Sequence, residues 1–409
     1  MTQTMNQSVT DQMCLDSLLG VVRNSGRVLI LPHNDPDPDA IASAVALEYV
    51  LRSLRSIDVT IAYGGIVGRA ENRALVAYLQ APLEKISKIE FDSFDRIALV
   101  DSQPGAGNNP LPADRQADIV VDHHQPFREA TSRAGHIDVR LNVGATSTIL
   151  TGYVLAAGLD LHPRLATALF YGIQTDTLGL GRRASSADKA AYVRLQPLLE
   201  VDELMSIQRA QVPHEYFRAL DQTLRKAEVY SVAVVAHLGE MYRPDMAAEM
   251  ADVLLRLEGM RWVMCSGFHR QTLYLSLRST RVNQGAGQVA QAVVKDLGLA
   301  GGHGTAGGGQ VPVGEQDKDE LVAEVRRRFL AALGLQDAPP RQLIAEEQPL
   351  WPKNQVPRAG ESPASLHWQV GAAVGTTSSD RAGPLGLRRL DRSAAGLAAR
   401  RQAGRIVCP

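Results

Sequence analysis

The first half of the chain alternates short apolar segments with helix-like segments, and this alternation constrains the fold more than any other feature. Continuous apolar runs are typical of strands that are covered on both faces of a sheet, and apolar residues at helical spacing between them indicate helices. The expected strands are Arg27–Pro32, Asp58–Ala62, Arg96–Asp101 and Asp118–Asp122, and the expected helices are Ala40–Leu54, Thr146–Ala157 and Pro163–Gln174. The alternation predicts an α/β domain built on a parallel sheet.

The pattern changes in the second half of the chain. Residues 186–226 are mostly helical in pattern, and we expect them to connect two domains. Beyond them we expect the strands Val229–His237, Arg261–His269 and Gln271–Arg278 and the helices Met246–Gly259, Gly287–Leu297 and Lys318–Leu333. The chain is therefore predicted to contain a first domain at 15–185 and a smaller, mixed α/β domain at 227–336.

The composition shifts again near Pro339. Residues 339–409 hold 8 of the 21 prolines, and residues 341–409 carry ten Lys and Arg against five Asp and Glu. Without a core periodicity, such a composition predicts a disordered tail, which we place at 337–409. The whole chain has a net charge of −1, so no global positive field indicates a long nucleic acid as its partner.

The termini and the cysteines bear on the compartment. The three cysteines are far apart, so they suggest neither a disulfide framework nor a cysteine zinc site. The first residues lack a basic region followed by an apolar run, and no segment approaches the roughly 18 apolar residues of a membrane span. We expect a cytoplasmic protein with no membrane partner.

Clusters of acids and histidines follow the expected strands, where open α/β sheets place their sites. The segment His33–Asp39, taken alone, fits either a metal site or a turn in which an Asp caps a helix. Asp101 ends a second strand, Asp122–His124 ends a third, and Asp176 ends a helix-like run. Taken together, these elements favour a metal site over turns and caps.

The charges of these residues suit two divalent cations. Four carboxylates balance two double positive charges, and two histidines add neutral ligands. Oxygen and nitrogen ligands without thiolates favour Mn²⁺, Mg²⁺ or Zn²⁺. The candidate ligands are His33, Asp37, Asp39, Asp101, His123 and Asp176.

These four elements together resemble the DHH phosphoesterase superfamily, which is named for an Asp-His-His such as Asp122–His124. The resemblance implies that His33 and Asp37 hold one metal and that Asp101 bridges to a second. Asp39, His123 and Asp176 would hold that second metal, with Mn²⁺ favoured and Mg²⁺ or other divalent ions open. The resemblance assigns catalytic roles to Asp101, Asp122, His123 and His124, and it places His124 against the substrate phosphate.

This sequence departs from the family pattern at two places. Asp35 adds an acid inside the first motif, so the ligand assignment there can shift. Leu178-Gly179-Leu180 replaces the usual Gly-aromatic segment after Asp176, which leaves the neighbouring pocket wall undefined.

A glycine-rich segment stands near the end of the second domain, at 301–309. Taken alone it is typical of a flexible linker, but beside the motifs above it resembles the signature of the DHH-associated C-terminal domain. Glycines let the backbone approach a ligand and present N–H groups as an anion nest. Leu275–Ser279 resembles the substrate strand of that domain. The implied substrate-binding residues are His124, Arg278, Ser279, Gly301, Gly302, His303, Gly307 and Gly308.

The resemblance implies two-metal hydrolysis of a phosphate ester. The expected substrates are short oligoribonucleotides (nanoRNA) and 3′-phosphoadenosine 5′-phosphate, as in bifunctional oligoribonuclease/pAp-phosphatase enzymes. A cyclic or linear dinucleotide phosphodiesterase is an alternative, and an inactive nucleotide-binding protein is an alternative of another class. The associated domain argues against the pyrophosphatase branch of the superfamily. The sequence leaves open whether the protein forms a homodimer.

Overall fold

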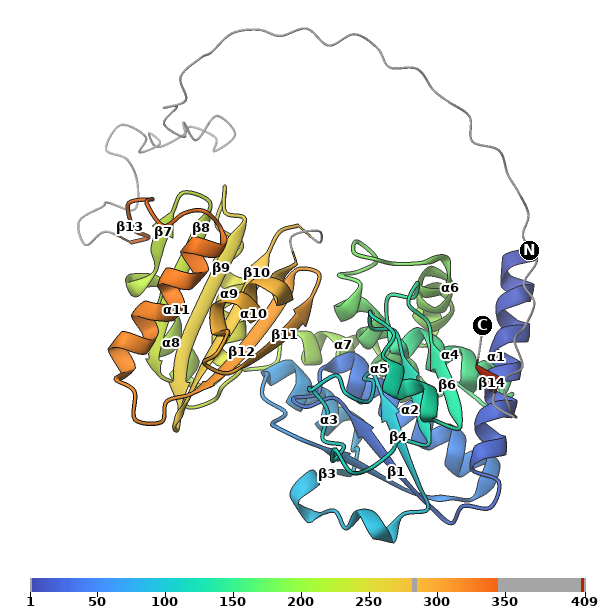
Figure 1. Ribbon diagram of the computed structural model, residues 1–409. Coiled ribbons are helices and arrows are strands. Elements are labelled where there is room, and N and C mark those ends of the chain that lie inside the picture. The colour runs from blue at the N-terminus through green and yellow to red at the C-terminus, as the bar shows by residue number, and fades with distance from the viewer. Residues whose placement is uncertain (1, 282–284, 345–405, 408–409) are drawn as a thin grey trace, which may run out of the picture.

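The computed structural model describes residues 2–281, 285–344 and 406–407, which form two α/β lobes lying side by side (Figure 1). The first lobe contains a seven-stranded sheet in the order β14-β6-β5-β4-β1-β2-β3. All neighbouring strands in it are parallel. The strands are β1 (Arg27–Pro32), β2 (Asp58–Tyr63), β3 (Leu83–Lys85), β4 (Arg96–Val100), β5 (Ile119–Asp122), β6 (His136–Val139) and β14 (Ile406–Val407).

Both faces of the first sheet are covered. Val28 and Ile30 point into a core shared with helices, whereas Leu29 and Leu31 point into a second cluster that includes Ile86 and Phe91. The helices of this lobe are α1 (Thr2–Val21), α2 (Pro38–Arg55), α3 (Ala70–Leu79), α4 (Thr146–Ala156), α5 (Pro163–Asp176), α6 (Ser186–Leu195) and α7 (Val201–Gln208). The parallel α/β architecture that the alternation predicted is therefore confirmed.

The second lobe contains a mixed sheet in the order β11-β12-β10-β9-β8-β7-β13. β8 and β9 are parallel, and the other neighbours are antiparallel. The strands are β7 (Glu228–Tyr230), β8 (Ala233–Glu240), β9 (Trp262–His269), β10 (Thr272–Ser279), β11 (Leu299–His303), β12 (Ala306–Pro312) and β13 (Arg341–Gln342). Helices α10 (Ala286–Val294) and α11 (Lys318–Ala332) cover one face, and α8 (His214–Lys226) and α9 (Met246–Leu254) cover the other. This smaller mixed domain is confirmed as well.

Several details differ from the expectations. The expected strand Val229–His237 is two strands, separated at Ser231, whose φ is 54°. Within the expected connector, α6 and α7 contribute Leu195, Leu204 and Ile207 to the first core. Most of the expected tail at 337–409 lies outside the described residues, namely 345–405 and 408–409. The described part of this tail contains the short strands β13 and β14.

The cysteines differ from the expectation too. Cys14 of α1 takes part in a disulfide bond, whereas the sequence suggested no disulfide framework. Cys265 is a buried free thiol in β9. Among the helices that the structure describes, none combines the length and the apolar character needed to cross a bilayer.

Candidate metal centre

The six predicted metal ligands lie together at one edge of the first sheet. His33, Asp101 and His123 follow β1, β4 and β5, which are neighbours in the sheet. Because the carboxyl ends of parallel strands meet at one edge, these residues converge. Asp37 and Asp39 lie at the start of α2, and Asp176 is the last residue of α5.

The first group of candidate ligands contains His33, Asp37 and Asp101. The Nε2 atom of His33 lies 3.6 Å from an oxygen of Asp37 and 3.5 Å from an oxygen of Asp101. Its Nδ1 lies 2.7 Å from the carbonyl oxygen of Asn34. A ring that donates from Nδ1 keeps the lone pair on Nε2, which is the arrangement that metal-binding histidines use.

The second group contains Asp39, His123 and Asp176. The Nε2 atom of His123 lies 3.4 Å from oxygens of both Asp101 and Asp176, and 3.9 Å from an oxygen of Asp39. Its Nδ1 lies 3.2 Å from the carbonyl oxygen of Val143. Nε2 is buried and has no hydrogen-bond partner among the described residues. A buried nitrogen that faces three carboxylates in this way fits a bound cation.

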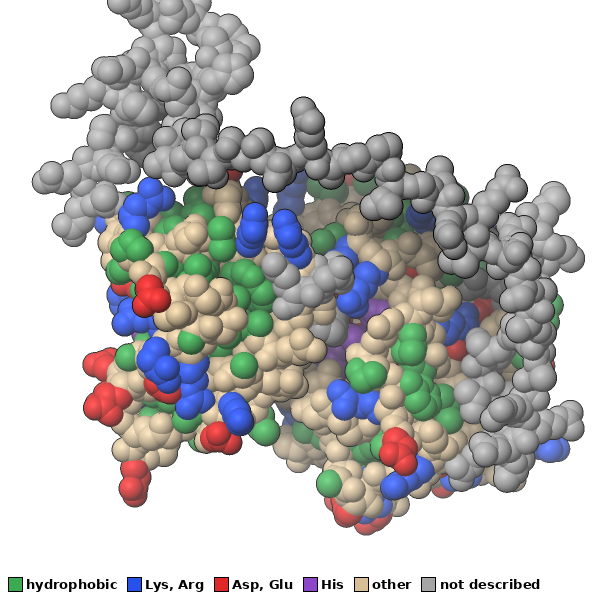
Figure 2. Space-filling view, turned by 45° about the horizontal axis from the view of Figure 1, so that its top comes forward, with side chains coloured by type: hydrophobic (Ala, Val, Ile, Leu, Met, Phe, Trp, Pro, Cys, Tyr) green, Lys and Arg blue, Asp and Glu red, His purple; other side chains and the backbone are tan. Residues whose placement is uncertain are grey.

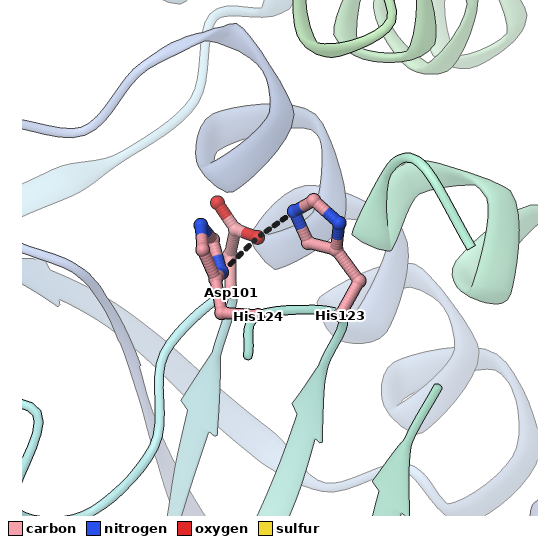
Figure 3. Close-up of side chains that lie close together, drawn as sticks. All are labelled: Asp101, His123 and His124. Atoms are coloured by element: carbon pink, nitrogen blue, oxygen red, sulfur yellow. Dashed lines mark ion pairs between the residues drawn. The ribbon is translucent and has the colours of Figure 1, made fainter. Parts of the chain in front are cut away.

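Asp101 belongs to the first group and also forms a third one with His123 and His124 (Figure 3). One of its oxygens faces His33, and the other faces His123 and also accepts a hydrogen bond from the Thr146 hydroxyl at 2.8 Å. Asp101 itself has a φ of 58° and is 1% exposed. This carboxylate therefore lies within reach of both groups of candidate ligands.

The protonation properties of the cluster indicate crowded negative charge. Burial, together with the neighbouring acids, raises the pKa values of Asp39 and Asp101 to about 6. Burial opposes a positive charge on His33, yet Asp37 and Asp101 raise the pKa of this ring to about 10. Divalent cations would relieve the repulsion that these carboxylates exert on each other. The ligand set therefore fits a metal centre.

The amino end of α4 fixes the acids in place, a role that the sequence analysis missed. The N–H groups of Thr146 and Ser147 each donate to Asp39 at 2.7 Å. A helix amino terminus stabilises a nearby carboxylate. The polar run Thr146–Thr148 at the start of an expected helix was the available signal.

Asp122 belongs to none of the candidate metal groups. It is fully buried, and one of its oxygens lies 2.8 Å from Nδ1 of His124. Gln103 donates to the other oxygen at 2.8 Å. The contact between Asp122 and His124 orients the ring of His124 beside Asp101, so Asp122 acts through His124. Gln103 is a second positioning residue that the sequence did not indicate.

Asp35 does not displace any ligand. Its carboxylate accepts a hydrogen bond from the N–H of Ile66 at 2.7 Å, and it lies outside the candidate metal groups. Its backbone is left-handed, with a φ of 55°. The extra acid therefore braces the loop after β1.

A cleft between the two lobes leads to the candidate ligands. Figure 2 shows histidine side chains at the bottom of a hollow between the lobes. The larger part of this cleft has a volume of about 1080 Å³ and is lined by Asp37, Asp176 and Arg278 among others. We call it the large hollow. It places side chains of the second lobe opposite the ligands of the first.

Arg278 lies in this cleft but is already paired. Its Nε lies 2.5 Å from Asp252, which is also 2.6 Å from Arg69 of the first lobe. Ser279 is 1% exposed, and its hydroxyl lies within 3.3 Å of the backbone of Arg281. Ser279 lies on the wall of the large hollow, at the end of β10.

The glycine-rich segment is a hairpin rather than a flexible linker. Gly301 pairs with Gly308 and Gly302 pairs with Gly307, so β11 and β12 form a ladder. A Cβ at Gly307 would collide with the carbonyl of Ala286, the first residue of α10. Gly302, Gly307 and Gly308 line a hollow together with His33 and Arg278, whereas the side chain of His303 lies outside the described residues.

Residues 27–173 match the family described as "DHH family, N-terminal domain". These residues are similar to a DHH domain. The match includes the predicted ligands from His33 to His123 and ends three residues before Asp176.

Two relatives are similar to this chain in sequence. An uncharacterized protein of Methanocaldococcus jannaschii is 33% identical over 320 residues, which cover 76% of this chain and 65% of that protein. A probable manganese-dependent inorganic pyrophosphatase of Bacillus cereus is 26% identical over 178 residues, covering 43% of this chain and 56% of that protein. The chain thus spans between about half and two thirds of the length of these relatives.

A solved structure shares the fold of both lobes. An exopolyphosphatase-related protein from Bacteroides fragilis superposes with a TM-score of 0.64 at 16% identity, covering 80% of this chain and 98% of that one. At this identity the likeness establishes the architecture alone.

Proposed function

We propose that the protein is a metal-dependent phosphoester hydrolase that acts on short oligoribonucleotides, on 3′-phosphoadenosine 5′-phosphate, or on both. The observation that carries the proposal is the buried, unpartnered Nε2 of His123, set among three carboxylates next to a second histidine site that shares Asp101. Bound divalent ions would supply an activated water and stabilise charge on the phosphoryl oxygens. We favour Mn²⁺, in keeping with the manganese-dependent relative.

The chain's own residues would hold and orient the reactants. His33, Asp37 and Asp101 would bind one ion, and Asp39, His123 and Asp176 the other. Their backbone partners fix both imidazole rings with Nε2 toward the centre. His124, held by Asp122, faces the cleft at the point where a phosphate would lie. Arg278 would contact the phosphate from the second lobe.

The large hollow supports a nucleotide rather than inorganic pyrophosphate. Its volume of about 1080 Å³ lies just above the range of roughly 300–1000 Å³ that small-molecule sites occupy. Tyr171, Leu178 and Tyr274 lie on its walls. Flat or apolar side chains of this kind pack against nucleobases.

Hydrolysis assays on the full chain would test the proposal. The protein is stripped with a chelator and assayed with added Mn²⁺ on dinucleotides to pentanucleotides, 3′-phosphoadenosine 5′-phosphate, cyclic dinucleotides and pyrophosphate. We expect Mn²⁺-dependent turnover of short oligonucleotides or of the bisphosphate. Turnover confined to pyrophosphate or cyclic dinucleotides would replace the proposed substrate, and a metal-loaded protein without turnover on the whole panel would overturn the proposal.

A further inference from the structure

A second hollow, which we call the small hollow, opens on the other side of the candidate metal ligands. It has a volume of about 250 Å³ and lies between the His123–His124 pair and the turn of the glycine hairpin. We propose that the small hollow binds a second phosphate group of the substrate through Arg183, so that the enzyme prefers substrates with a phosphate beyond the scissile one. This inference rests on the proposed function.

The two hollows meet at the metal site. Asp176, Arg182, Thr305 and Ala306 line both of them. The large hollow also reaches Asp37, whereas the small hollow reaches His123 and His124. A phosphorus atom held at the centre would therefore have one substituent in each hollow, as in a diester or an extended nucleotide.

Charge distinguishes the two hollows. The large hollow has six carboxylates on its walls against four arginines. The small hollow has two arginines, Arg182 and Arg183, against the single carboxylate of Asp176. Once that carboxylate is committed to a metal, the small hollow keeps only positive charge apart from its histidines. The more anionic end of a substrate is therefore favoured there.

Size agrees with this assignment. The volume of about 250 Å³ falls below the roughly 300–1000 Å³ of typical small-molecule sites. It suits a phosphate or another compact group, whereas a nucleoside fits the large hollow. Asn142 lines the small hollow, and its side-chain amide is a hydrogen-bond donor that suits phosphate oxygens. The amide of Gln125, on the same wall, already donates one hydrogen bond to the carbonyl oxygen of Leu141 at 2.9 Å.

The two arginines differ in their engagement. The guanidinium of Arg182 donates to the carbonyl of Asp176 at 2.8 and 3.2 Å and to the hydroxyl of Thr305 at 3.2 Å, so it positions the wall. Arg183 is exposed, and its guanidinium crosses to the second lobe. A Cβ at Gly304 would lie 3.1 Å from its Nη2, so the guanidinium lies close over the hairpin turn.

The backbone that presents these arginines is unusual. Leu178, Leu180 and Arg183 all have left-handed φ values, of 48°, 70° and 50°. Non-glycine residues rarely adopt this region, and such positions cluster at functional sites. The segment 178–183, which follows the proposed ligand Asp176 in the chain, therefore has the backbone shape that brings Arg183 over the hairpin.

Substrate preference tests the proposal. We would measure kcat/KM with Mn²⁺ for a dinucleotide with and without a terminal phosphate, at the 5′ or the 3′ end, in the wild type and in Arg183→Gln. We expect the wild type to prefer one phosphorylated form by roughly 10- to 100-fold, the range of a charge-assisted phosphate contact. Arg183→Gln should lose this preference, and Arg183→Lys should keep part of it.

Arg209→Gln is the matched control, because Arg209 is an exposed arginine of the first lobe that lines neither hollow. It should leave the ratio between the two substrates unchanged. Equal losses on both substrates in Arg183→Gln, or a wild type without a phosphate preference, would overturn the proposal.

A calorimetric binding experiment distinguishes a failure of this inference from a failure of the proposed function, because binding needs no turnover. It uses dinucleotides whose phosphorothioate linkage resists hydrolysis. The wild type should bind the terminally phosphorylated form more tightly, and Arg183→Gln should bind both forms alike. Equal binding of both forms by the wild type would refute the small hollow as a phosphate site even if hydrolysis is observed.

Discussion

At the scale of single residues, the site depends on charges that are buried at a free-energy cost. Asp101 is almost completely buried, and burial together with Asp39 raises the pKa of its carboxyl to about 6. A carboxylate in such a place is tolerated when a cation or a hydrogen-bond donor compensates it. Thr146 donates one hydrogen bond, and we assign the remaining compensation to metal.

The substitution Asp101→Asn separates a ligand role from a structural one. We expect turnover to fall by at least roughly a thousandfold, since a charge that acts on the reacting centre is lost. The melting temperature of the metal-free protein should not fall, because a crowded charge is removed while the shape is kept. Activity and thermal unfolding are measured beside Asp58→Asn, whose carboxylate is 61% exposed at the other end of the sheet. Near-normal turnover of Asp101→Asn would rule out the bridging role.

A buried histidine away from the metal centre makes stability depend on pH. His136 lies 2.9 Å from the hydroxyl of Tyr153 and 3.1 Å from that of Ser17, and burial lowers its pKa to about 4. Asp138 and Arg140 are the charged groups near it. The unfolded chain takes up this proton near pH 6.5, so the stability that the neutral ring provides is lost as the pH falls from 6.5 to 4. The loss should reach about 3 kcal/mol.

Denaturant unfolding at pH 7 and pH 4.5 checks this prediction. The difference in unfolding free energy between the two pH values should be smaller in His136→Gln than in the wild type. His214→Gln, at an exposed histidine, should leave the difference unchanged. An unaltered difference in His136→Gln would show that the ring does not titrate as described.

The sequence identified the candidate ligands better than their supports. Acids and histidines at strand ends are visible as a pattern, because binding a divalent cation demands particular residue types. Gln103, Ser147 and Arg183 are ordinary polar residues in sequence. Their roles arise from contacts with residues 19 to 121 positions away, which no local pattern encodes.

At the scale of elements, the sequence predicted those whose burial pattern is simple. β1, β4 and β5 are continuous apolar runs, and their predicted bounds differ from the structure by at most one residue. β6 was missed because its buried residues include His136 and Asp138. The partners that make this burial tolerable are Arg140, directly after the strand, and Tyr153 in α4.

Packing of α10 against the glycine hairpin gives a prediction at this scale. Gly287 lies where a Cβ would meet the carbonyl of Gly302 in β11. Gly287→Ala should therefore cost about 1–3 kcal/mol of unfolding free energy by overpacking. Gly20 lies in α1 with open space around it, so Gly20→Ala should instead gain about 0.5–1 kcal/mol. A stabilising Gly287→Ala would contradict the close approach of helix and hairpin.

At the scale of the whole molecule, the proposed activity needs both lobes. The first lobe supplies the candidate ligands, and the second supplies Arg278 and the hairpin. An ion-pair network, Arg69–Asp252–Arg278, runs between the lobes. The sequence predicted two domains but not their relative placement, because that depends on contacts between residues about 180 positions apart.

Removal of Arg278 should separate substrate use from metal binding. We expect Arg278→Ala to lower kcat/KM by roughly 10- to 100-fold through the loss of a charge-assisted contact. The Mn²⁺ content should stay at the wild-type value, since the ligands lie on the other lobe. Arg270→Ala serves as the control, because Arg270 is an exposed arginine just before the first residue of β10. Equal losses of metal and activity would contradict the placement of Arg278.

The central claim is that side chains from four separate stretches of the chain bind a pair of metal ions around Asp101. Anomalous diffraction from crystals of the full chain soaked in Mn²⁺ tests this directly. The account predicts two anomalous peaks per molecule, one beside His33 and Asp37 and one beside Asp39, His123 and Asp176, with Asp101 between them. No peak at Asp101, or peaks only at other places on the molecule, would contradict it.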